Sequence, residues 1–385
     1  MFCIKASSLI SSLCYSIFKL EPYTSCYFNC SYCYSRWYGV DHMQQPTPVY
    51  SILSFFRNIV REVRRRGLKP IPFRLSTLVD PFQPVELEHK ISLKILKIAL
   101  EEEYPLIVNT KSTLVMHGEH GVVLERLLEN KLAVLQVSIS VLSDRVSGII
   151  EPRAPSPAAR LKLLEYYGSR GMPIVLRLSP FILGASPTMP EEFEGLAGAL
   201  RDIKVKHVVV ESLRLESSSM TMLATTLGLR DIQVESYSLR GEPGLVRFSR
   251  HVLGKVYREL SEKLLKHGIT FATCKEGLFE YHTAPDCCGI FMLRDARART
   301  TLYDVYLHLK EAPGTSMQDL TTTYLEACKR FNRLCKEHIS EYPRPISKPL
   351  RWHEKKLLRV LEDRNTLVHV APSLVNYLTL ASEQK

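Results

Sequence analysis

The sequence lacks several features that would assign it to a common protein class. No apolar run reaches the eighteen or so residues that a transmembrane helix needs, and internal repeats and low-complexity tracts are absent. No Gly-x-Gly-x-x-Gly motif follows a strand-like segment, which argues against a dinucleotide-binding fold. Residues 34–273 contain no cysteine, so the ten thiols of the chain are clustered. We therefore expect a globular protein without a membrane span, in which thiols gather at particular places.

The bulk composition fits a soluble protein with a sizeable core. Of the 385 residues, 45% are hydrophobic and 24% are charged, enough for one large domain or a domain with an appendage. The opening stretch MFCIKASSLISSLCYSIF faintly resembles a signal peptide, but serines interrupt it and no small-residue cleavage site follows. We expect it to belong to the mature protein. The net charge of +11 permits an anionic partner such as nucleic acid, although many soluble surfaces are equally basic.

Three thiols stand close together in the segment EPYTSCYFNCSYCYSRWY (21–38), at Cys26, Cys30 and Cys33. A disulfide framework would spread cysteines along a small secreted chain, so the clustering indicates metal ligation in a reducing, cytoplasmic compartment. A cubane iron–sulfur cluster takes one thiolate per iron, so three thiols leave one iron open, as in catalytic metal sites. Zinc sites prefer two Cys-x-x-Cys pairs, or one such pair with histidines, and only Cys30 and Cys33 have that spacing.

Strand-like and helix-like segments alternate along the first half of the chain, which predicts parallel βαβ units. The short connections favour a partial or full β/α barrel, in which the chemistry lies at the carboxyl ends of the strands. The cysteine loop follows the first strand, and polar clusters follow later ones. We expect strands at 15–23, 72–79, 106–114, 133–140, 174–183 and 207–215, and helices at 49–66, 86–103, 121–130, 156–170 and 190–203.

The rest of the chain is expected to be organised differently. Residues 1–215 would form the barrel, 216–345 an irregular, cysteine-containing extension, and 346–385 a basic helical tail after an extended proline-containing linker at 341–349. The extension would hold an auxiliary iron–sulfur cluster or a zinc ion outside the barrel, or else buried free thiols. The last two of its thiols, seven apart, would share a helix face. These cysteines are Cys274, Cys287, Cys288, Cys328 and Cys335.

The Cys-x-x-x-Cys-x-x-Cys spacing after a first strand resembles the radical S-adenosylmethionine (SAM) superfamily. More narrowly, the segment is similar to the opening of the spore photoproduct lyase-like proteins, also described as DNA repair photolyase-related. Glu21 and Ser25 replace the Asn and Gly usual in that opening. The resemblance covers roughly residues 8–215 and continues in STLVDPFQPVE (76–86), NTKS (109–112), VSIS (137–140), EPRAPSPAARL (151–161) and GMPIVLRLSPFILG (171–184).

The resemblance implies a partial (β/α)6 barrel with a 4Fe-4S cluster on Cys26, Cys30 and Cys33, and with SAM on the open iron. Reductive cleavage of SAM would give a 5′-deoxyadenosyl radical that abstracts hydrogen from a substrate, after reduction by a donor such as a ferredoxin or flavodoxin.

The same resemblance assigns roles to polar residues at the strand ends. Tyr32 and Tyr34 would pack on the cluster and the adenine, or simply in the loop. Lys111 would meet the SAM carboxylate and Ser138 its ribose or carboxylate. The SAM amino group would be bound by Asp80, Gln83 or Glu86, and Arg153 and Arg177 are candidates for the SAM carboxylate or a substrate phosphate. Segments similar to that around Cys287 and Cys288 follow the barrel in some relatives, which suggests a second metal site with Cys274.

One departure bears on the reaction. The lyase itself returns a hydrogen atom from a cysteine that follows the cluster motif, whereas this chain has Ser76 or Thr77 near that place. Repair of spore photoproduct is therefore not expected, and a radical enzyme acting on a nucleic acid or nucleotide is the leading hypothesis. Two alternatives stay open: a radical SAM enzyme for a small molecule or peptide, and a non-catalytic iron–sulfur or zinc protein that binds nucleic acid. The arginine-rich segment at 57–67 is interpreted as the solvated face of an outer helix.

Overall fold

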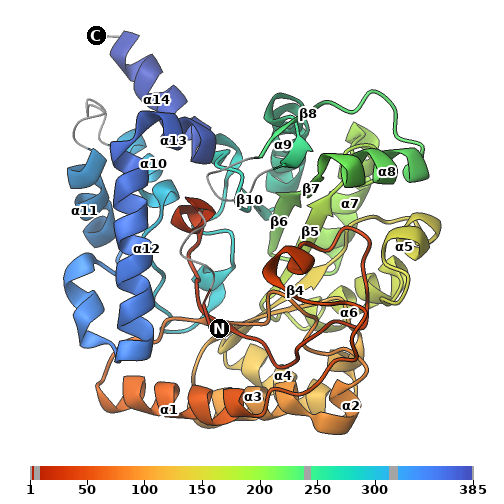
Figure 1. The fold of residues 1–385 in the computed structure, drawn as a ribbon, viewed down its shortest axis with the longest axis vertical. Helices are drawn as coiled ribbons and strands as arrows, with labels where there is room; N and C mark the ends of the chain where they lie inside the picture. The colour runs from red at the N-terminus through yellow and green to blue at the C-terminus, as the bar shows by residue number, and fades with distance from the viewer. Residues whose placement is uncertain (1, 4–8, 238–243, 312–319, 384–385) are drawn as a thin grey trace.

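The central element of the fold is a sheet of seven parallel strands in the spatial order β1-β2-β3-β4-β5-β6-β10. The computed structural model describes residues 2–3, 9–237, 244–311 and 320–383 (Figure 1). The predicted class, an α/β protein with a partial barrel, is confirmed. The strands are β1 (Lys19–Leu20), β2 (Phe73–Leu75), β3 (Leu106–Thr110), β4 (Ala133–Ser138), β5 (Ile174–Phe181), β6 (His207–Ser212) and β10 (Thr270–Thr273).

The strands are buried on both faces, as expected of a parallel sheet covered by helices. Side chains alternate along each strand, so one set faces the outer helices and the other faces the barrel interior. Leu106, Val108 and Leu135 belong to the outer core. The inner set includes Ile107, Val134, Val175, Val209 and Ala272, which share a second core with residues from beyond the barrel.

Helices connect successive strands and cover the outer face of the sheet (Figure 1). Their starts are set by local chemistry: the hydroxyls of Ser143 and Ser156 accept the Val146 and Ala159 N–H groups at the beginnings of α5 and α6. The helices of this part are α1 (Ser51–Arg65), α2 (Glu86–His89), α3 (Ile91–Glu101), α4 (Gly118–Glu129), α5 (Asp144–Ile150), α6 (Pro157–Gly168) and α7 (Pro190–Asp202).

The seventh strand comes from beyond residue 215. After a three-stranded antiparallel sheet, α9 leads into β10, which pairs in parallel with β6. The sheet therefore has one strand more than the six expected, and the domain division at residue 215 stays a prediction. This part comprises β7 (Arg214–Glu216), α8 (Ser217–Leu227), β8 (Val234–Ser236), β9 (Leu245–Phe248) and α9 (Arg250–Lys266).

The C-terminal helices lie beside the barrel, at the left of Figure 1. The N-terminal 3-10 helix η1 (Leu9–Leu13) contacts several of them, so the two ends of the chain pack together. None of the helices in the described ranges is both long and apolar enough to cross a bilayer. The helices are α10 (Leu302–Glu311), α11 (Leu320–Arg330), α12 (Arg344–Glu362), α13 (Arg364–Val370) and α14 (Pro372–Glu383).

Two predictions for this region are wrong. The segment 341–349 is not an extended linker, because α12 already begins at Arg344. Pro343 and Pro345 lie at its start, where a missing N–H costs no helical hydrogen bond. Cys328 and Cys335 do not share a helix, since α11 ends at Arg330. Instead, the two cysteines form a disulfide.

Candidate active site

A cavity of about 350 Å³ lies at the carboxyl ends of the barrel strands. It is lined by residues that end or follow β2, β3, β4, β5, β6 and β10, the edge at which β/α barrels carry their chemistry. The structure thus brings together most of the residues singled out in the sequence: Cys26, Cys30, Tyr32, Cys33, Tyr34, Asp80, Lys111, Ser138, Arg177, Cys274, Cys287 and Cys288.

The cysteine loop is held in place by polar contacts from outside it. Gln83 Nε2 donates to the carbonyl of Ser25 at 2.9 Å, and its Oε1 accepts the N–H of Tyr27 at 2.6 Å. The Arg36 guanidinium donates to the carbonyl of Cys33 at 2.9 Å. Gln83, one of three residues considered for the SAM amino group, therefore positions the loop and does not line the cavity.

The three loop thiols differ in their electrostatic surroundings. Burial raises the pKa of both Cys26 and Cys30 to about 12. Burial also acts on Cys33, but hydrogen bonds with His42 and Ser35 outweigh it and lower its pKa to about 7. A metal binds the thiolate form, so its binding would release the protons of these thiols. Three thiols in one short loop are a donor set that suits an iron–sulfur cluster.

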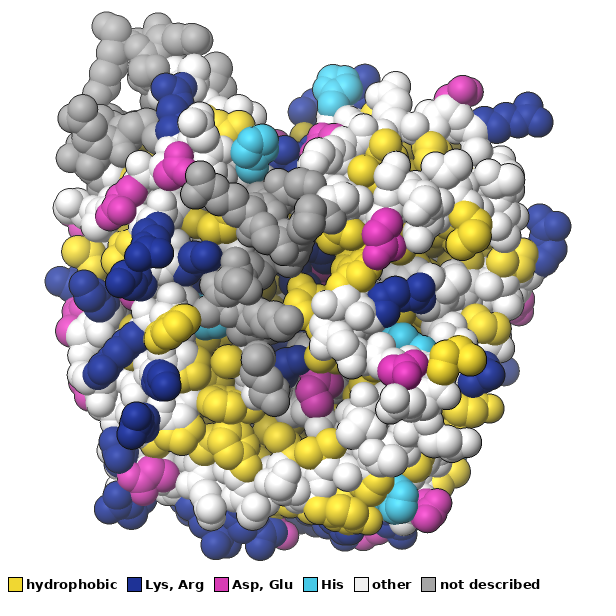
Figure 2. All heavy atoms as spheres, viewed as in Figure 1, with side chains coloured by type: hydrophobic (Ala, Val, Ile, Leu, Met, Phe, Trp, Pro, Cys, Tyr) yellow, Lys and Arg dark blue, Asp and Glu magenta, His cyan; other side chains and the backbone are white. Residues whose placement is uncertain are grey.

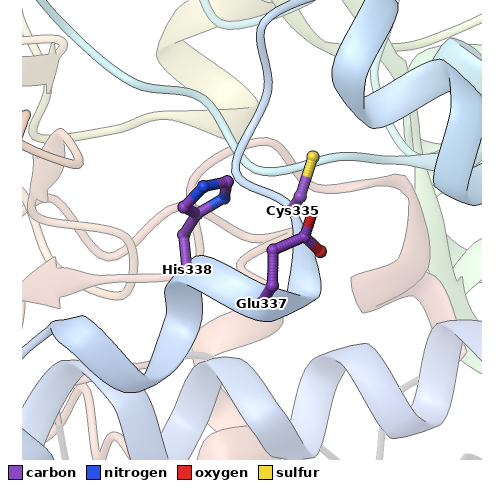
Figure 3. A group of neighbouring side chains, drawn as sticks. All are labelled: Cys335, Glu337 and His338. Carbon is purple, nitrogen blue, oxygen red and sulfur yellow. The ribbon is translucent and has the colours of Figure 1, made fainter.

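The distances between the loop thiols also distinguish a cluster site from a site for a single metal ion. Across the described ranges, three or more possible ligand atoms come within 4.8 Å of one another only at Cys335, Glu337 and His338 (Figure 3). That group offers no free thiol, because Cys335 is bonded to Cys328. The three loop thiols do not all lie within 4.8 Å of one another, which fits attachment to separate irons better than ligation of one ion.

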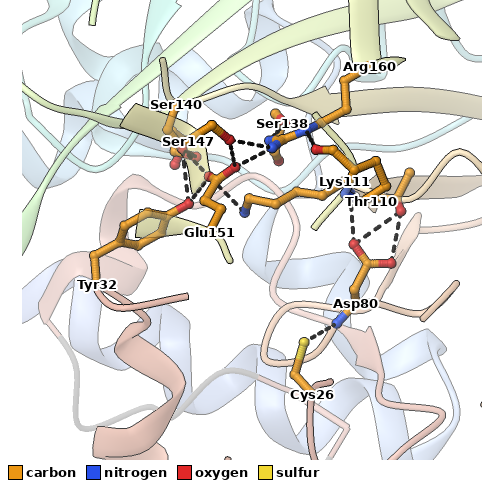
Figure 4. A network of polar contacts seen from close by, with 12 residues as sticks. Cys26, Tyr32, Asp80, Thr110, Lys111, Ser138, Ser140, Ser147, Glu151 and Arg160 are labelled. Atoms are coloured by element: carbon orange, nitrogen blue, oxygen red, sulfur yellow. Dashed lines mark hydrogen bonds and ion pairs between the residues drawn. The ribbon is translucent and has the colours of Figure 1, made fainter. Parts of the chain in front are cut away.

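A buried ionic network lies beside the loop (Figure 4). Lys111 Nζ is 4.0 Å from Glu151 Oε1 and 5.7 Å from the centre of the Tyr32 ring. Glu151 also accepts from Ser140 Oγ at 2.7 Å and from the hydroxyl of Tyr32, and it pairs with Arg160. Burial opposes its ionisation, but Lys111 and Arg160 outweigh this and lower the pKa of Glu151. The network therefore holds a charged lysine at the cavity wall.

Asp80 connects this network to the cysteine loop. Its N–H donates to Cys26 Sγ at 3.4 Å, while its carboxylate accepts from Thr110 Oγ1 at 2.8 Å and from the Lys111 N–H at 2.7 Å (Figure 4). Burial raises the pKa of Asp80. The carboxylate thus belongs to the same wall of the cavity as Lys111.

The other candidates near this wall have different surroundings. Glu86 is buried away from the cavity, where it accepts from the Ser92 N–H at 2.9 Å and pairs with His120. Ser138 lines the cavity, and its carbonyl accepts from Arg160 Nη1 at 2.9 Å. Arg153 is exposed and lies over the Tyr27 ring, outside the cavity lining.

Glu211, which sequence reasoning missed, organises the opposite wall. Its buried carboxylate accepts from Arg177, Arg214 and Lys275, the last at 3.1 Å. Burial opposes ionisation, but Lys275, Arg214 and Arg177 lower the pKa of Glu211 well below its usual range. A signal was present in the sequence, because an acidic residue ends the otherwise apolar run HVVVES of β6. Lys275 also lies 5.6 Å from the centre of the Tyr34 ring.

The sequence predicts the second thiol group outside the barrel. This prediction is wrong, because the group lies inside it. Cys274, Cys287 and Cys288 line the same cavity as the cysteine loop, while Cys328 and Cys335 are paired elsewhere. Two further thiols, Cys3 and Cys14, also line the cavity. Neither was predicted, since no motif connects the N-terminal stretch with the later cysteines.

Comparison with known proteins agrees with this geometry. Residues 20–197 match the family model of the radical SAM superfamily. The chain contains a radical SAM domain. The match agrees with the superfamily predicted from the cysteine motif, over the part of the chain that it covers. An uncharacterized protein of Acidianus two-tailed virus, ORF301, is 31% identical over 193 residues, or 49% of this chain. The chain spans 61% of that relative's length.

Solved structures show the same fold around the radical SAM domain. A cysteine-to-serine mutant of spore photoproduct lyase superposes with a TM-score of 0.52 at 15% identity, over 67% of this chain and 77% of that one. The lyase complexed with dinucleoside spore photoproduct gives a TM-score of 0.50 at 14% identity, with the same coverage. At these identities the likeness concerns the fold alone.

Proposed function

We propose that this chain is a radical SAM enzyme that binds a 4Fe-4S cluster on Cys26, Cys30 and Cys33 and binds SAM in the adjoining cavity. The observation that supports it is the cavity itself, where the three loop thiols meet Asp80 and Lys111 at the strand ends. When bound and reduced by a donor such as a ferredoxin or flavodoxin, the cluster and SAM supply a 5′-deoxyadenosyl radical that abstracts hydrogen from the substrate.

The residues of the chain would orient SAM and exclude water from it. The Lys111 ammonium is charged, and only 17% of its side chain is exposed, which suits a carboxylate in a poorly solvated site. Asp80, beside the cluster ligand Cys26, suits the amino group. Ser138 offers a hydroxyl for the ribose or carboxylate, and the rings of Tyr32 and Tyr34 offer apolar packing surface.

The test is anaerobic reconstitution with iron and sulfide, reduction with dithionite, and measurement of 5′-deoxyadenosine after addition of SAM. We expect product from the wild-type chain and none from Cys30→Ala. A variant with both Cys328 and Cys335 replaced by Ala removes the disulfide outside the cavity without leaving an unpaired thiol; it is the control and should keep the product. A fully loaded, reducible cluster that binds SAM but gives no product, with or without nucleic acid, would favour a non-catalytic binding protein.

We propose a nucleic acid as the substrate, because α12 carries an unpaired basic stripe. The spacing of three and four residues puts five cations on one helix face, and all five are exposed. None of them makes an ion pair with any other residue that the structure describes, and Trp352 beside them is 64% exposed. Lys and Arg side chains gather over α12 in Figure 2. The stripe consists of Arg344, Lys348, Arg351, Lys355 and Arg359.

The arginines of α1 make a matched contrast. Arg57, Arg61 and Arg65 are paired with Glu101, Glu102 and Glu62, as expected of a solvated outer helix. Cations that already have carboxylate partners gain less from phosphates than unpaired ones. The dinucleoside in the complexed lyase of the same fold also favours a nucleic-acid substrate.

Filter binding of a labelled single-stranded oligonucleotide at several salt concentrations tests this. Replacing Lys348, Lys355 and Arg359 by Ala should weaken binding and reduce the salt slope by roughly 2, since each lost phosphate contact contributes about 0.7. Replacing Arg57, Arg61 and Arg65 by Ala should change the binding affinity and the salt slope much less. Equal effects of the two triple variants, or salt-independent binding, would favour a small-molecule or peptide substrate instead.

We also propose that Cys274, Cys287 and Cys288 bind an auxiliary metal centre, either iron–sulfur or zinc. Supporting this is their position on the same cavity as the cluster loop, with Cys287 Sγ and Cys288 Sγ 3.8 Å apart.

A further inference from the structure

We propose that Cys14 completes the second thiol group, and that Cys14, Cys274, Cys287 and Cys288 hold a second iron–sulfur cluster inside the barrel. The inference rests on the proposed metal at the last three thiols. It does not depend on SAM cleavage, and its test is separate from that of the first cluster.

The four thiols come from two parts of the chain that are far apart in the sequence, the N-terminal stretch and residues 274–288. Cys14 follows η1, Cys274 directly follows β10, and the adjacent pair precedes the 3-10 helix η5 (Ile290–Met292). Cys287 Sγ and Cys288 Sγ are 3.8 Å apart, and Cys274 and Cys14 line the same cavity as this pair. Cys14 is close enough to Cys274 and Cys288 for their charges to act on it. Burial in a core accounts for single thiols, but it gives no reason for four of them to converge on one cavity wall.

The loop that carries Cys287 and Cys288 is fixed before any metal binds. The buried carboxylate of Asp286 accepts the N–H groups of Cys288, Ile290 and Phe291 at 2.8, 2.9 and 2.9 Å. Gln136 Nε2, on β4, donates to the Cys288 carbonyl at 2.7 Å. Supporting hydrogen bonds of this kind are what orient ligands in metal sites.

Two buried guanidinium groups lie beside the thiols, and only that of Arg177 has a carboxylate partner, Glu211. Arg74 Nη2 donates to Cys288 Sγ at 2.8 Å, and its only other partner in the described part of the chain is Asn109 Oδ1 at 3.5 Å. Arg177 lies beside Cys274 and keeps a buried Nη1 without a hydrogen-bond acceptor. Buried guanidinium groups need anionic partners. A thiolate-bound cluster with net negative charge would supply one to Arg74, which pairs with no carboxylate of the described residues.

The spread of the sulfurs favours a cluster over zinc. Tetrahedral zinc with bonds of about 2.3 Å would bring every pair of sulfurs to about 3.8 Å. Although Cys287 and Cys288 are that close, Cys274 and these two do not all lie within 4.8 Å of one another. In a cubane cluster each thiolate binds a different iron, so the sulfurs stand farther apart than around one zinc ion. With four thiols every iron is capped, so this centre, unlike that of the cysteine loop, has no open iron for SAM.

The experiment removes the first cluster and measures what remains. The chain with Cys26, Cys30 and Cys33 all replaced by Ala is reconstituted anaerobically, and iron, acid-labile sulfide and zinc are measured together with the electron paramagnetic resonance of the reduced protein. We expect roughly four irons and four sulfides per chain. Adding Cys14→Ala should lower the iron content by half or more and alter the spectrum. Adding Cys3→Ala, which removes another thiol of the cavity lining, should do neither.

Three outcomes would overturn the inference: zinc in place of iron, no bound metal, or equal iron contents in the Cys14→Ala and Cys3→Ala variants. Folding is checked by the single Cys14→Ala variant, which should keep the irons of the cysteine loop; if it does not, Cys14→Ser replaces it in the comparison. Loss of SAM cleavage in a wild-type chain that retains the second cluster would contradict the proposed function and leave this inference standing.

Discussion

At the scale of single residues, Lys111 is held in its place by charge. Its ammonium lies 4.0 Å from Glu151 Oε1, and although burial works against its charge, the negative charges of Cys30 and Glu151 raise the pKa of Lys111. Glu151 is itself fixed by Arg160 and Ser140. A cation held in this way needs little rearrangement to meet a carboxylate in the cavity.

We therefore predict that Lys111→Ala weakens SAM binding. Loss of a charge-assisted hydrogen bond of about 1.5–3 kcal/mol corresponds to a rise in the dissociation constant of roughly 10- to 150-fold. Equilibrium binding of SAM to the anaerobically reconstituted protein measures it. The control is Lys97→Ala, which removes a surface lysine paired with Glu119. If the two variants bind SAM equally well, Lys111 does not contact the cofactor.

His282 is a buried residue whose protonation opposes folding. Its Nε2 accepts from the Thr273 N–H at 3.0 Å and from Thr273 Oγ1 at 2.7 Å, and its ring lies 4.6 Å from that of Tyr303. Burial lowers its pKa from the usual 6.5 to about 3. Because the unfolded chain binds this proton more readily, the stability that His282 contributes is present above pH 6.5 and is lost as the pH falls toward 3.

We predict that His282→Gln, which keeps an acceptor but does not titrate, makes the protein less sensitive to acid. Within the window from pH 6.5 to 3, His282 removes about 1.4 kcal/mol of the free energy of unfolding for each pH unit. Anaerobic urea unfolding at pH 7.5, 6 and 5 compares the slopes. A variant with the wild-type slope would show that other groups, such as the buried His207, set the acid response.

At the scale of elements, the loop after β10 determines how the C-terminal helices dock. Gly277 has φ +71°, and a Cβ there would lie 2.1 Å from the Val370 carbonyl oxygen and 2.8 Å from Ala371 Cα. The backbone between α13 and α14 thus packs directly on this glycine. Gly228, at the end of α8, has a similar φ of +68° but nothing within 4 Å of a Cβ.

These two glycines allow conformational strain to be separated from packing. We predict that Gly228→Ala lowers the free energy of unfolding by about 1–2 kcal/mol, the cost of a left-handed conformation. Gly277→Ala should lower it by roughly twice as much or more, since the helices must also move. Urea unfolding of both variants is the measurement. Equal losses in the free energy of unfolding would mean that the C-terminal helices shift to make room for the added methyl group at no cost.

The barrel elements could be predicted from sequence because their signals are local. Apolar β-branched runs mark β3 to β6, and Ser156 and Pro157 mark the start of α6. The loop thiols were likewise recognisable from short spacing. In contrast, β10 is a four-residue strand that depends on β6 for its partners, and Glu151 gains its role only from Lys111, forty residues earlier in the chain. No local pattern reports such long-range contacts, nor that Cys14 and Cys274 line the same cavity.

At the scale of the whole molecule, the barrel is not complete at residue 215. Its last strand and the loop of Cys287 and Cys288 come from the following region, and Gly289 packs against Val134 and Val175 inside the barrel. A fragment ending at 215 would leave the edge of β6 unpaired and the inner core open.

We predict that residues 1–215 expressed alone aggregate, and that co-expression with residues 216–385 restores a soluble complex, because β10 can then pair with β6. Size-exclusion chromatography after purification through a tag on the first fragment would show the complex. A monomeric, SAM-binding fragment 1–215 would instead establish the predicted division as a domain boundary.

The placement of the two thiol groups also affects how the protein is made. Roughly 240 residues separate Cys33 from Cys274, and at 5–20 residues per second a ribosome needs about 12–48 seconds to synthesise them. The loop of Cys26, Cys30 and Cys33 therefore leaves the ribosome well before β10, the last strand of the sheet. It also leaves before Cys274, Cys287 and Cys288, the thiols proposed to join Cys14. If iron were inserted as thiols appear, the loop of Cys26 would be loaded on an unfinished barrel and the inner group only after synthesis is nearly complete.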